Sequence, residues 1–338
     1  MRELLKTEHL SVSFFTKSGE VEAVRDVSLT VEEGEVLAIV GESGCGKSAL
    51  CKSIMKLLPK TAKIKSGKIL ADGIDITDYT QRNMSRLRGD LFSMIFQDPM
   101  TALNPTMTIG KQIEEAVRIH NKKMPKKQVK KKVLELMQLV EIDEPEVRIS
   151  QYPHEFSGGM RQRAVMAIAL AGNPKILFAD EPTTALDVTI QAQILDVFRR
   201  IQKKLGMATV FISHDLGVVA GVADRVAVMY AGKIVEIGTA EEIFYDPRHP
   251  YTWGLLQSLP ILSRGKEWLP TLPGMPPTLI HPPKGDAFAE RNAYAMRIDY
   301  EKEPPMFQVT DTHYAATWLL DERAPEVKAP IGERRYGK

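Results

Sequence analysis

The sequence predicts an α/β fold around a mixed or parallel sheet. Three short apolar runs, at residues 36–40, 176–179 and 209–213, have the length and composition of strands buried on both faces. A fourth run, at 226–230, has the same character and precedes a hairpin-like turn and a strand at 234–236. Between the first two runs, residues 99–171 have apolar residues spaced for helix faces, which predicts an inserted helical subdomain.

The N-terminal segment predicts an antiparallel β region. Residues 10–15 mix apolar and small residues, and residues 21–31 carry apolar residues near a period of two, so both indicate strands. Residues 48–58 have a helical pattern, which Pro59 ends.

The composition changes near Asp246. Of the 21 prolines, 13 lie at or after Pro247, which predicts an extended, loop-rich C-terminal appendage with little regular structure. We therefore expect one domain at residues 1–245, with its helical subdomain at about 99–171, and the appendage at 246–338.

Charge, hydropathy and cysteine content narrow the class of protein. The formal net charge of +2, from 45 basic and 43 acidic residues, gives no reason to expect nucleic acid as a partner. No apolar run approaches the roughly 20 residues of a spanning helix, and the N-terminus resembles no signal peptide. We expect a soluble protein, or one that reaches a membrane only through partners. The two cysteines, Cys45 and Cys51, form no disulfide framework or metal motif.

Residues 41–48 fit the phosphate-loop pattern G-x-x-x-x-G-K-[S/T] in full, between a predicted buried strand and a predicted helix. Glycines let successive N–H groups point at phosphate oxygens, and the helix N-terminus adds partial positive charge. Lys47 would reach the β- and γ-phosphates, and Ser48 would coordinate Mg²⁺. A chance glycine-rich turn is the alternative, which this context disfavours. The predicted nucleotide-binding residues are Gly41, Glu42, Ser43, Gly44, Cys45, Gly46, Lys47, Ser48 and Ala49.

Two acidic residues follow the apolar run at 176–179. Asp180 at the end of a buried strand is placed to help hold Mg²⁺, and Glu181 is placed to polarise the attacking water. The alternative is a pair of surface acids that cap the strand, which becomes less attractive beside a phosphate loop.

A third motif begins at Phe156. A Ser-Gly-Gly turn that opens a helix offers a hydroxyl, exposed N–H groups and a helix N-terminus to an anion, although Ser157 could also be an ordinary helix cap. The run at 156–163, Phe-Ser-Gly-Gly-Met-Arg-Gln-Arg, resembles the signature motif of ABC transporter ATPases, normally Leu-Ser-Gly-Gly-Gln. In this chain the signature residues are Ser157, Gly158, Gly159 and Met160.

The remaining motifs occur in the order that this family requires. Gln97 resembles the Q-loop glutamine, residues 184–187 with Asp187 resemble the D-loop, and His214 matches the switch histidine. Phe14 is the candidate for stacking on adenine, with Phe15 as the alternative. The resemblance covers about residues 1–265 and implies a P-loop ABC ATPase core.

The resemblance implies a mechanism. Two such domains enclose two ATP molecules, each between the phosphate loop of one chain and the signature of the other. Glu181 would be the general base, Lys47 and His214 would contact the γ-phosphate, and Ser48, Gln97 and Asp180 would hold Mg²⁺. Closing and opening of the pair would move the attached permeases.

The segments 97–105 and 249–256 are similar to those of oligopeptide, dipeptide and nickel importers. The Phe-Ser-Gly-Gly-Met form of the signature is similar to that in the first of the two ATPase subunits of the peptide importers. The implied function is MgATP hydrolysis that powers peptide import, with nickel or another small solute as the alternative. The implied partners are a second ATPase subunit in a heterodimer, two membrane permeases and, indirectly, an extracellular or periplasmic peptide-binding protein. The implied location is the cytoplasmic face of the cell membrane.

The tail departs from the family. Many such subunits carry four cysteines there, thought to hold an iron–sulfur cluster, and this chain lacks all four, so we expect no cluster. At those positions it has Asp286, Asn292, Asp299 and Thr317.

Other classes of function are less well supported. A soluble ABC ATPase of DNA repair or translation usually has long coiled-coil insertions or two cassettes, neither of which is visible. A P-loop kinase would lack the signature and the switch histidine. The seven lysines between 122 and 132 indicate a solvated helix face, with contact to anionic lipid as the alternative.

Overall fold

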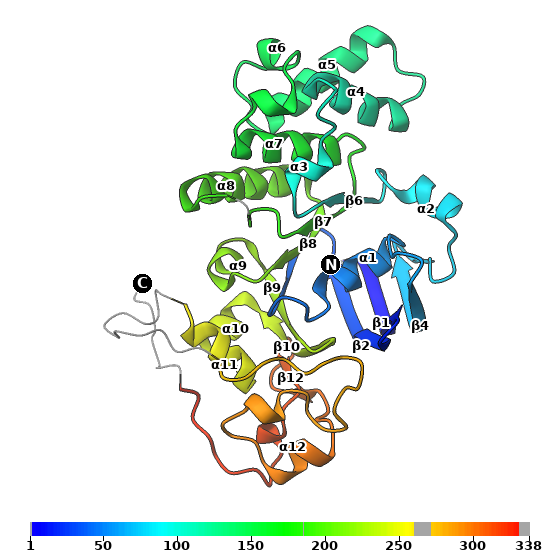
Figure 1. Cartoon of the computed structure of the whole chain (residues 1–338). Coiled ribbons are helices and arrows are strands. Elements are labelled where there is room, and N and C mark those ends of the chain that lie inside the picture. Colours follow the sequence, from blue (N-terminus) through cyan, green and yellow to red (C-terminus); the bar gives the residue numbers. More distant parts are fainter. Residues whose placement is uncertain (1, 185, 260–271, 331–338) are drawn as a thin grey trace. The chain divides into compact units, whose positions relative to one another are not determined.

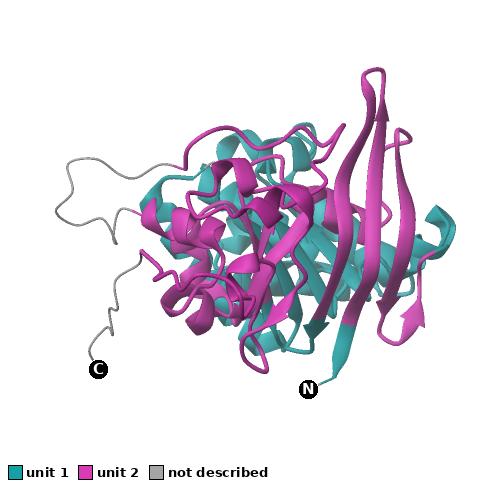
Figure 2. Cartoon of the chain, turned by 90° about the horizontal axis from the view of Figure 1, so that it is seen from below, with its two compact units in different colours: residues 1–4, 31–36, 78–212 teal, residues 5–30, 37–77, 213–338 magenta. Residues whose placement is uncertain are grey.

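The computed structural model describes residues 2–184, 186–259 and 272–330 (Figure 1). The chain divides into two compact units (Figure 2). The first unit comprises Met1–Leu4, Val31–Val36 and Asp78–Ile212. The second comprises Leu5–Thr30, Leu37–Thr77 and Ser213–Lys338. Among the described residues, none of the helices combines the length and the apolar character that crossing a membrane requires.

Three parallel strands form the sheet of the first unit, in the order β8-β7-β6. Every residue of the central strand β7 (Ile176–Asp180) is buried. Its neighbours are β6 (Phe92–Ile95) and β8 (Ala208–Ser213). A strand with neighbours on both edges and apolar side chains on both faces gives the continuous apolar run seen in the sequence.

The helices between β6 and β7 confirm the predicted helical insertion (Figure 1). Helix α7 packs against α3, α4, α5 and α8, and it is therefore the centre of this bundle. Side chains of Thr108, Ser157 and Asp187 cap α4, α7 and α8. The helices of this unit are α2 (Gln81–Leu87), α3 (Pro99–Ala102), α4 (Ile109–His120), α5 (Lys126–Leu139), α6 (Pro145–Arg148), the 3₁₀ turn η1 (Pro153–Glu155), α7 (Gly158–Ala169) and α8 (Val188–Leu205).

The second unit contains two sets of strands. An antiparallel sheet has the order β2-β1-β4-β5, with β1 at Glu3–Thr16, β2 at Gly19–Glu32, β4 at Ala62–Ala71 and β5 at Ile74–Asp75. In the other set, β3 (Val36–Val40) pairs in parallel with β9 (Arg225–Tyr230), which pairs in antiparallel with β10 (Lys233–Thr239). Two short strands, β12 (Tyr314–Ala315) and β11 (Phe307–Gln308), extend this set from β10.

Short helices complete the second unit. They are α1 (Lys47–Ile54), α9 (Leu216–Val222), α10 (Ala240–Tyr245), α11 (Pro250–Gln257), η2 (Ala289–Arg291), α12 (Arg297–Glu301) and η3 (Trp318–Leu320). One expected helix end was wrong. Helix α1 ends at Ile54 rather than residue 58, because Lys56 adopts a left-handed conformation with φ of 53°. The described part of the C-terminal appendage is mostly loop, as its prolines predicted, and its helices and strands are short. The domain boundary at residue 245 stays a prediction.

A buried carboxylate joins three segments of the second unit. Glu236 on β10 is fully buried, and it accepts hydrogen bonds from the N–H groups of Arg248 (2.5 Å) and His249 (3.1 Å). It also lies 2.8 Å from Nε2 of His313, a residue that is itself fully buried just before β12. This carboxylate therefore fixes the start of α11 and the C-terminal strands against β10.

Replacing Glu236 by alanine is expected to lower the free energy of unfolding by about 3 kcal/mol, because the N–H groups of Arg248 and His249 and the buried ring of His313 lose their partner. Denaturant unfolding of the full chain measures this loss. The control is Glu241→Ala, an exposed acid in the first turn of α10, which should cost under about 1 kcal/mol. Equal losses in the two variants would show that Glu236 is not an anchor.

Candidate functional site

The phosphate loop lies between β3 and α1, as predicted, and its glycines are required by the backbone. Gly41, Gly44 and Gly46 have φ values of 152°, 80° and 110°, in the region that side chains disfavour. A Cβ on Gly41 would lie 2.1 Å from the carbonyl oxygen of Met229, and one on Gly46 would lie 2.2 Å from that of Ala23. The loop can follow this path because it carries glycine at these positions.

The lysine of this loop is held inside it. Lys47 is 4% exposed, and its Nζ donates hydrogen bonds to the carbonyl oxygens of Gly41 (2.7 Å) and Glu42 (2.8 Å). Burial raises the pKa of the neighbouring Cys45 thiol, which keeps it protonated and uncharged. Ser48 is the second residue of α1, so its hydroxyl is at the N-terminal end of that helix. The loop thus presents a positive charge and a helix N-terminus, a combination that binds phosphate.

In the first unit, the predicted acidic residues Asp180 and Glu181 lie at the end of strand β7. Asp180 is its last residue and is 3% exposed. The side chain of Glu181 accepts hydrogen bonds at 3.0 Å from the amide of Gln97 and from the hydroxyl of Thr184. Sequence reasoning identified Gln97 and Glu181 separately, and the structure joins them. Sequence reasoning did not identify Thr184 as a partner of Glu181.

Glu181 has an unusual backbone conformation. Its φ is 47°, which side-chain-bearing residues adopt at an energetic cost, and its N–H donates to the carbonyl of Ile212 on β8. Such strain is concentrated at functional sites. The sheet therefore holds the carboxylate of Glu181 in a defined direction, where Gln97 and Thr184 orient it further.

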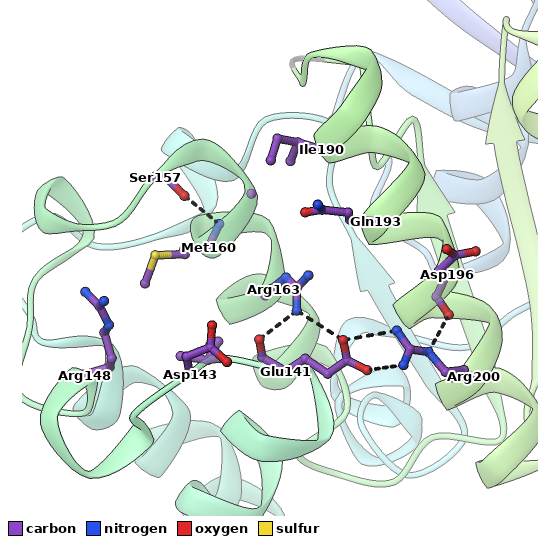
Figure 3. Close-up of a pocket in the computed structure, with 12 residues that line it drawn as sticks. Glu141, Asp143, Arg148, Ser157, Met160, Arg163, Ile190, Gln193, Asp196 and Arg200 are labelled. Atoms are coloured by element: carbon purple, nitrogen blue, oxygen red, sulfur yellow. Dashed lines mark hydrogen bonds and ion pairs between the residues drawn. The ribbon is translucent and has the colours of Figure 1, made fainter.

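Three of the signature residues, Ser157, Gly159 and Met160, line a pocket of about 450 Å³ in the first unit (Figure 3). The hydroxyl of Ser157 accepts the N–H of Met160 at 3.3 Å, which caps α7. Gly159 packs so closely on α8 that a Cβ would lie 2.6 Å from Cγ2 of Ile190. Ser157 is therefore the N-cap of α7, and the role of residues 157–160 toward an anion stays a prediction.

Other residues that line this pocket carry charges that compensate one another. Glu141 binds Arg200 at 2.8 and 3.1 Å, and Arg163 donates to the backbone carbonyl of Glu141 at 2.7 Å (Figure 3). These pairs connect the C-terminal end of α5 to α7 and α8, so they hold the signature turn in place.

The remaining predicted residues lie as follows. Asp187 caps α8 by accepting the N–H of Ile190 at 3.0 Å, and Ala185 of the predicted D-loop lies outside the described residues. His214 is exposed and follows β8. Phe14 is half-buried on β1, whereas Phe15 is 40% exposed beneath the ammonium groups of two lysines. The roles of these residues remain predictions.

The four positions where the family pattern places cysteine are buried in the second unit, and they carry no thiolate. Asp286 accepts the N–H of Phe288 at 2.9 Å, Asp299 that of Met296 at 2.6 Å, and Thr317 that of Leu319 at 3.3 Å. The side chain of Asn292 accepts the N–H of Tyr294 at 3.0 Å. All four side chains therefore organise turns through hydrogen bonds, and the set does not fit an iron–sulfur cluster.

Comparison with known proteins assigns the class and then the family. Residues 24–184 match the family described as "ABC transporter", and residues 235–298 match "Oligopeptide/dipeptide transporter, C-terminal region". The chain belongs to the ABC transporter family of ATP-binding proteins, in its oligopeptide and dipeptide transport group. The family predicted from the signature and the C-terminal segments is confirmed.

Two relatives have nearly the same length. The oligopeptide transport ATP-binding protein OppD of Bacillus subtilis is 59% identical, over 97% of this chain and 92% of the relative. The dipeptide transport ATP-binding protein DppD of Lactococcus lactis is 57% identical, over 96% of this chain and 93% of the relative.

Solved structures confirm the predicted fold. The ATP-binding cassette MJ0796, in a dimeric post-hydrolysis state with ADP and Pi, matches with a TM-score of 0.63 and 26% identity, over 70% of this chain and 99% of that one. The protein cbiO1 of Clostridium perfringens matches with a TM-score of 0.64 and 29% identity, over 73% of this chain and 92% of that one.

Asp286 gives a test of the buried C-terminal turns. Burial raises the pKa of its carboxyl group to about 6. A raised pKa in the folded state adds stability that is complete below the unfolded value of about 3.9 and is lost as the pH rises through about 6. Asn keeps the acceptor for Phe288 without a charge. The stability of Asp286→Asn relative to the wild type should therefore increase by about 2 to 3 kcal/mol between pH 4 and pH 8.

Thermal and denaturant unfolding at pH 4, 5, 6, 7 and 8 would measure this difference. The control is Asp311→Asn, an exposed acid of the same region. A pH-independent difference between Asp286→Asn and the wild type would mean that the carboxyl group of Asp286 is not buried as described.

Proposed function

We propose that this chain is the ATPase subunit that powers peptide import through a membrane ABC transporter. The observation that carries the proposal is the loop at 41–48, whose glycine backbone encloses the buried Lys47 and would form a cradle for phosphate. The relatives are named oligopeptide and dipeptide transport proteins, which favours a peptide over nickel as the solute.

ATP would bind with its phosphates in the loop at 41–48 and its adenine on Phe14 or Phe15. Lys47 would leave the carbonyls of Gly41 and Glu42 for the β- and γ-phosphates. Both carbonyls belong to the loop itself, so the ammonium group would exchange them for phosphate oxygens by a small movement within the loop.

Magnesium would be held by Ser48, Gln97 and Asp180. Hydroxyl, amide and carboxylate oxygens are the hard donors that this ion prefers, and one buried carboxylate with substrate phosphates is typical of its sites. When bound, the ion neutralises charge on the transferring phosphoryl group.

Glu181 would act as general base on the attacking water, with Gln97 and Thr184 fixing the direction of its carboxylate. His214 would contact the γ-phosphate. Lys47 and His214 belong to the second unit, and Gln97, Asp180 and Glu181 to the first.

The signature residues 157–160 and Asp187 would serve the ATP bound by a second ATPase subunit. The exposed Ser157 and Gly158 open α7 toward solvent, where an anion on another chain can approach the helix N-terminus. Two permeases would bind this pair of subunits at the cytoplasmic face of the membrane, and a peptide-binding protein would deliver the solute.

The hydrolysis step is tested by ATPase activity of the chain alone and assembled with its second ATPase and permeases. Glu181→Gln should reduce activity in the assembly about a hundredfold or more while nucleotide binding persists, because only the base is lost. Lys47→Ala should instead lose binding.

The matched control is Glu146→Gln, an exposed acid in α6, which should leave activity unchanged. If the Glu181→Gln assembly hydrolyses ATP at the wild-type rate, the site on this chain's loop is regulatory and the role of Glu181 is wrong.

A further inference from the structure

A bidentate ion pair connects the phosphate loop to the C-terminal region, which here means the described residues after 245. Nη1 and Nη2 of Arg291 lie 2.6 and 2.9 Å from the two carboxylate oxygens of Glu42, although the residues are 249 positions apart. Both belong to the second unit. The side chain of Arg291 is 4% exposed and that of Glu42 is 28% exposed. A planar pair with two parallel hydrogen bonds fixes direction as well as distance.

Arg291 is itself held firmly. Its Nε donates to the carbonyl of Pro273 at 2.8 Å, and Nη1 donates to the hydroxyl of Tyr230 at 3.2 Å. The guanidinium lies over the rings of Tyr230 and Phe288, 5.6 and 5.9 Å from their centres. Its hydrogen bonds to Glu42 raise the pKa of the guanidinium further above its ordinary value, so it stays charged.

Glu42 makes a second contact with the C-terminal region, through Tyr251. Its backbone N–H donates to the hydroxyl of Tyr251 at 2.8 Å. Tyr251 is placed by the start of α11, where Nδ1 of His249 accepts its N–H at 3.0 Å. Burial lowers the pKa of His249 to about 3, so the ring is neutral and can accept. The Tyr251 ring packs 4.6 Å from that of Tyr230.

Both contacts act on Glu42, the residue whose carbonyl oxygen accepts a hydrogen bond from Lys47. The carbonyl of Glu42 accepts from Nζ of Lys47, while its N–H and side chain are fixed by the C-terminal region. Charge matters as well, since an unpaired carboxylate on this loop would repel phosphate. Arg291 neutralises that charge.

We infer that Arg291 and Tyr251 are positioning residues through which the C-terminal region sets the nucleotide affinity of the phosphate loop. This inference rests on the proposed function for its assignment of nucleotide to the loop. Arg291 acts by orienting Glu42 and cancelling its charge, and Tyr251 acts by holding its backbone.

The test is the Kd of MgADP for the full chain, measured by calorimetry. Arg291→Gln should raise the Kd about tenfold, within the usual range of coupling between sites. Adding Glu42→Gln to that variant should restore at least half of the loss, because the repelling charge is gone. Arg291→Lys, which keeps the charge but not the bidentate geometry, should raise the Kd about threefold. If the double variant binds no more tightly than Arg291→Gln, the charge-based role is wrong.

The matched control is Arg297→Gln, whose side chain is 92% exposed in the same region, and which should bind as the wild type does. Lys47→Ala separates the two proposals. Binding retained by Lys47→Ala would place the nucleotide elsewhere. Binding lost in Lys47→Ala, together with a wild-type Kd in Arg291→Gln, would overturn the inference alone.

If Arg291→Gln does not fold, Arg291→Lys and Tyr251→Phe decide the question. Tyr251→Phe removes only the hydroxyl that meets the N–H of Glu42, and it should raise the Kd about threefold. An unchanged Kd in both variants would overturn the inference.

Discussion

The path of the phosphate loop is set by how closely it passes two backbone carbonyls. Met229 on β9 meets the loop at Gly41, and Ala23 on β2 meets it at Gly46, each at a distance that excludes a Cβ. This contact brings the loop carbonyls around the ammonium of Lys47. The strands, α1 and the residues that brace the loop all serve this arrangement, since a phosphate cradle must exist before the nucleotide binds.

The C-terminal region takes part in that arrangement rather than only following it. Glu236 ties the start of α11 and the residues before β12 to β10, and α11 in turn carries Tyr251 to the loop. The side chains of Asp286 and Asp299 organise the turns on either side of Arg291 by accepting hydrogen bonds from backbone N–H groups. A region of buried polar turns without thiolates is therefore able to place one charged side chain accurately at the loop.

Local patterns in the sequence predicted the parts of the fold that depend on local chemistry. Strands buried on both faces, such as Val36–Val40 and Ile176–Asp180, appear as apolar runs because every side chain is buried. Strand β4 was missed because lysines and a glycine interrupt its apolar residues, and its pairing with β1 is what makes it a strand. The motifs at 41–48, 156–163 and 180–181 were located because each is contiguous.

Pairings between distant residues could not be predicted in the same way. The hydrogen bond between Gln97 and Glu181 and the ion pair between Glu42 and Arg291 join residues 84 and 249 positions apart. An acidic residue within a phosphate loop was a signal that some cation must compensate it, but no local pattern selects Arg291 among 45 basic residues. Only the folded second unit identifies the partner.

Hydrogen–deuterium exchange of the full chain, with and without MgADP, tests the link between the loop and the C-terminal region most directly. The backbone N–H groups of Asp286, Phe288, Arg291 and Asn292 are all hydrogen-bonded, so slower exchange there reports a tighter region. The account predicts that nucleotide slows exchange at residues 41–48 and at 286–292 together. Slower exchange confined to residues 41–48 would contradict it.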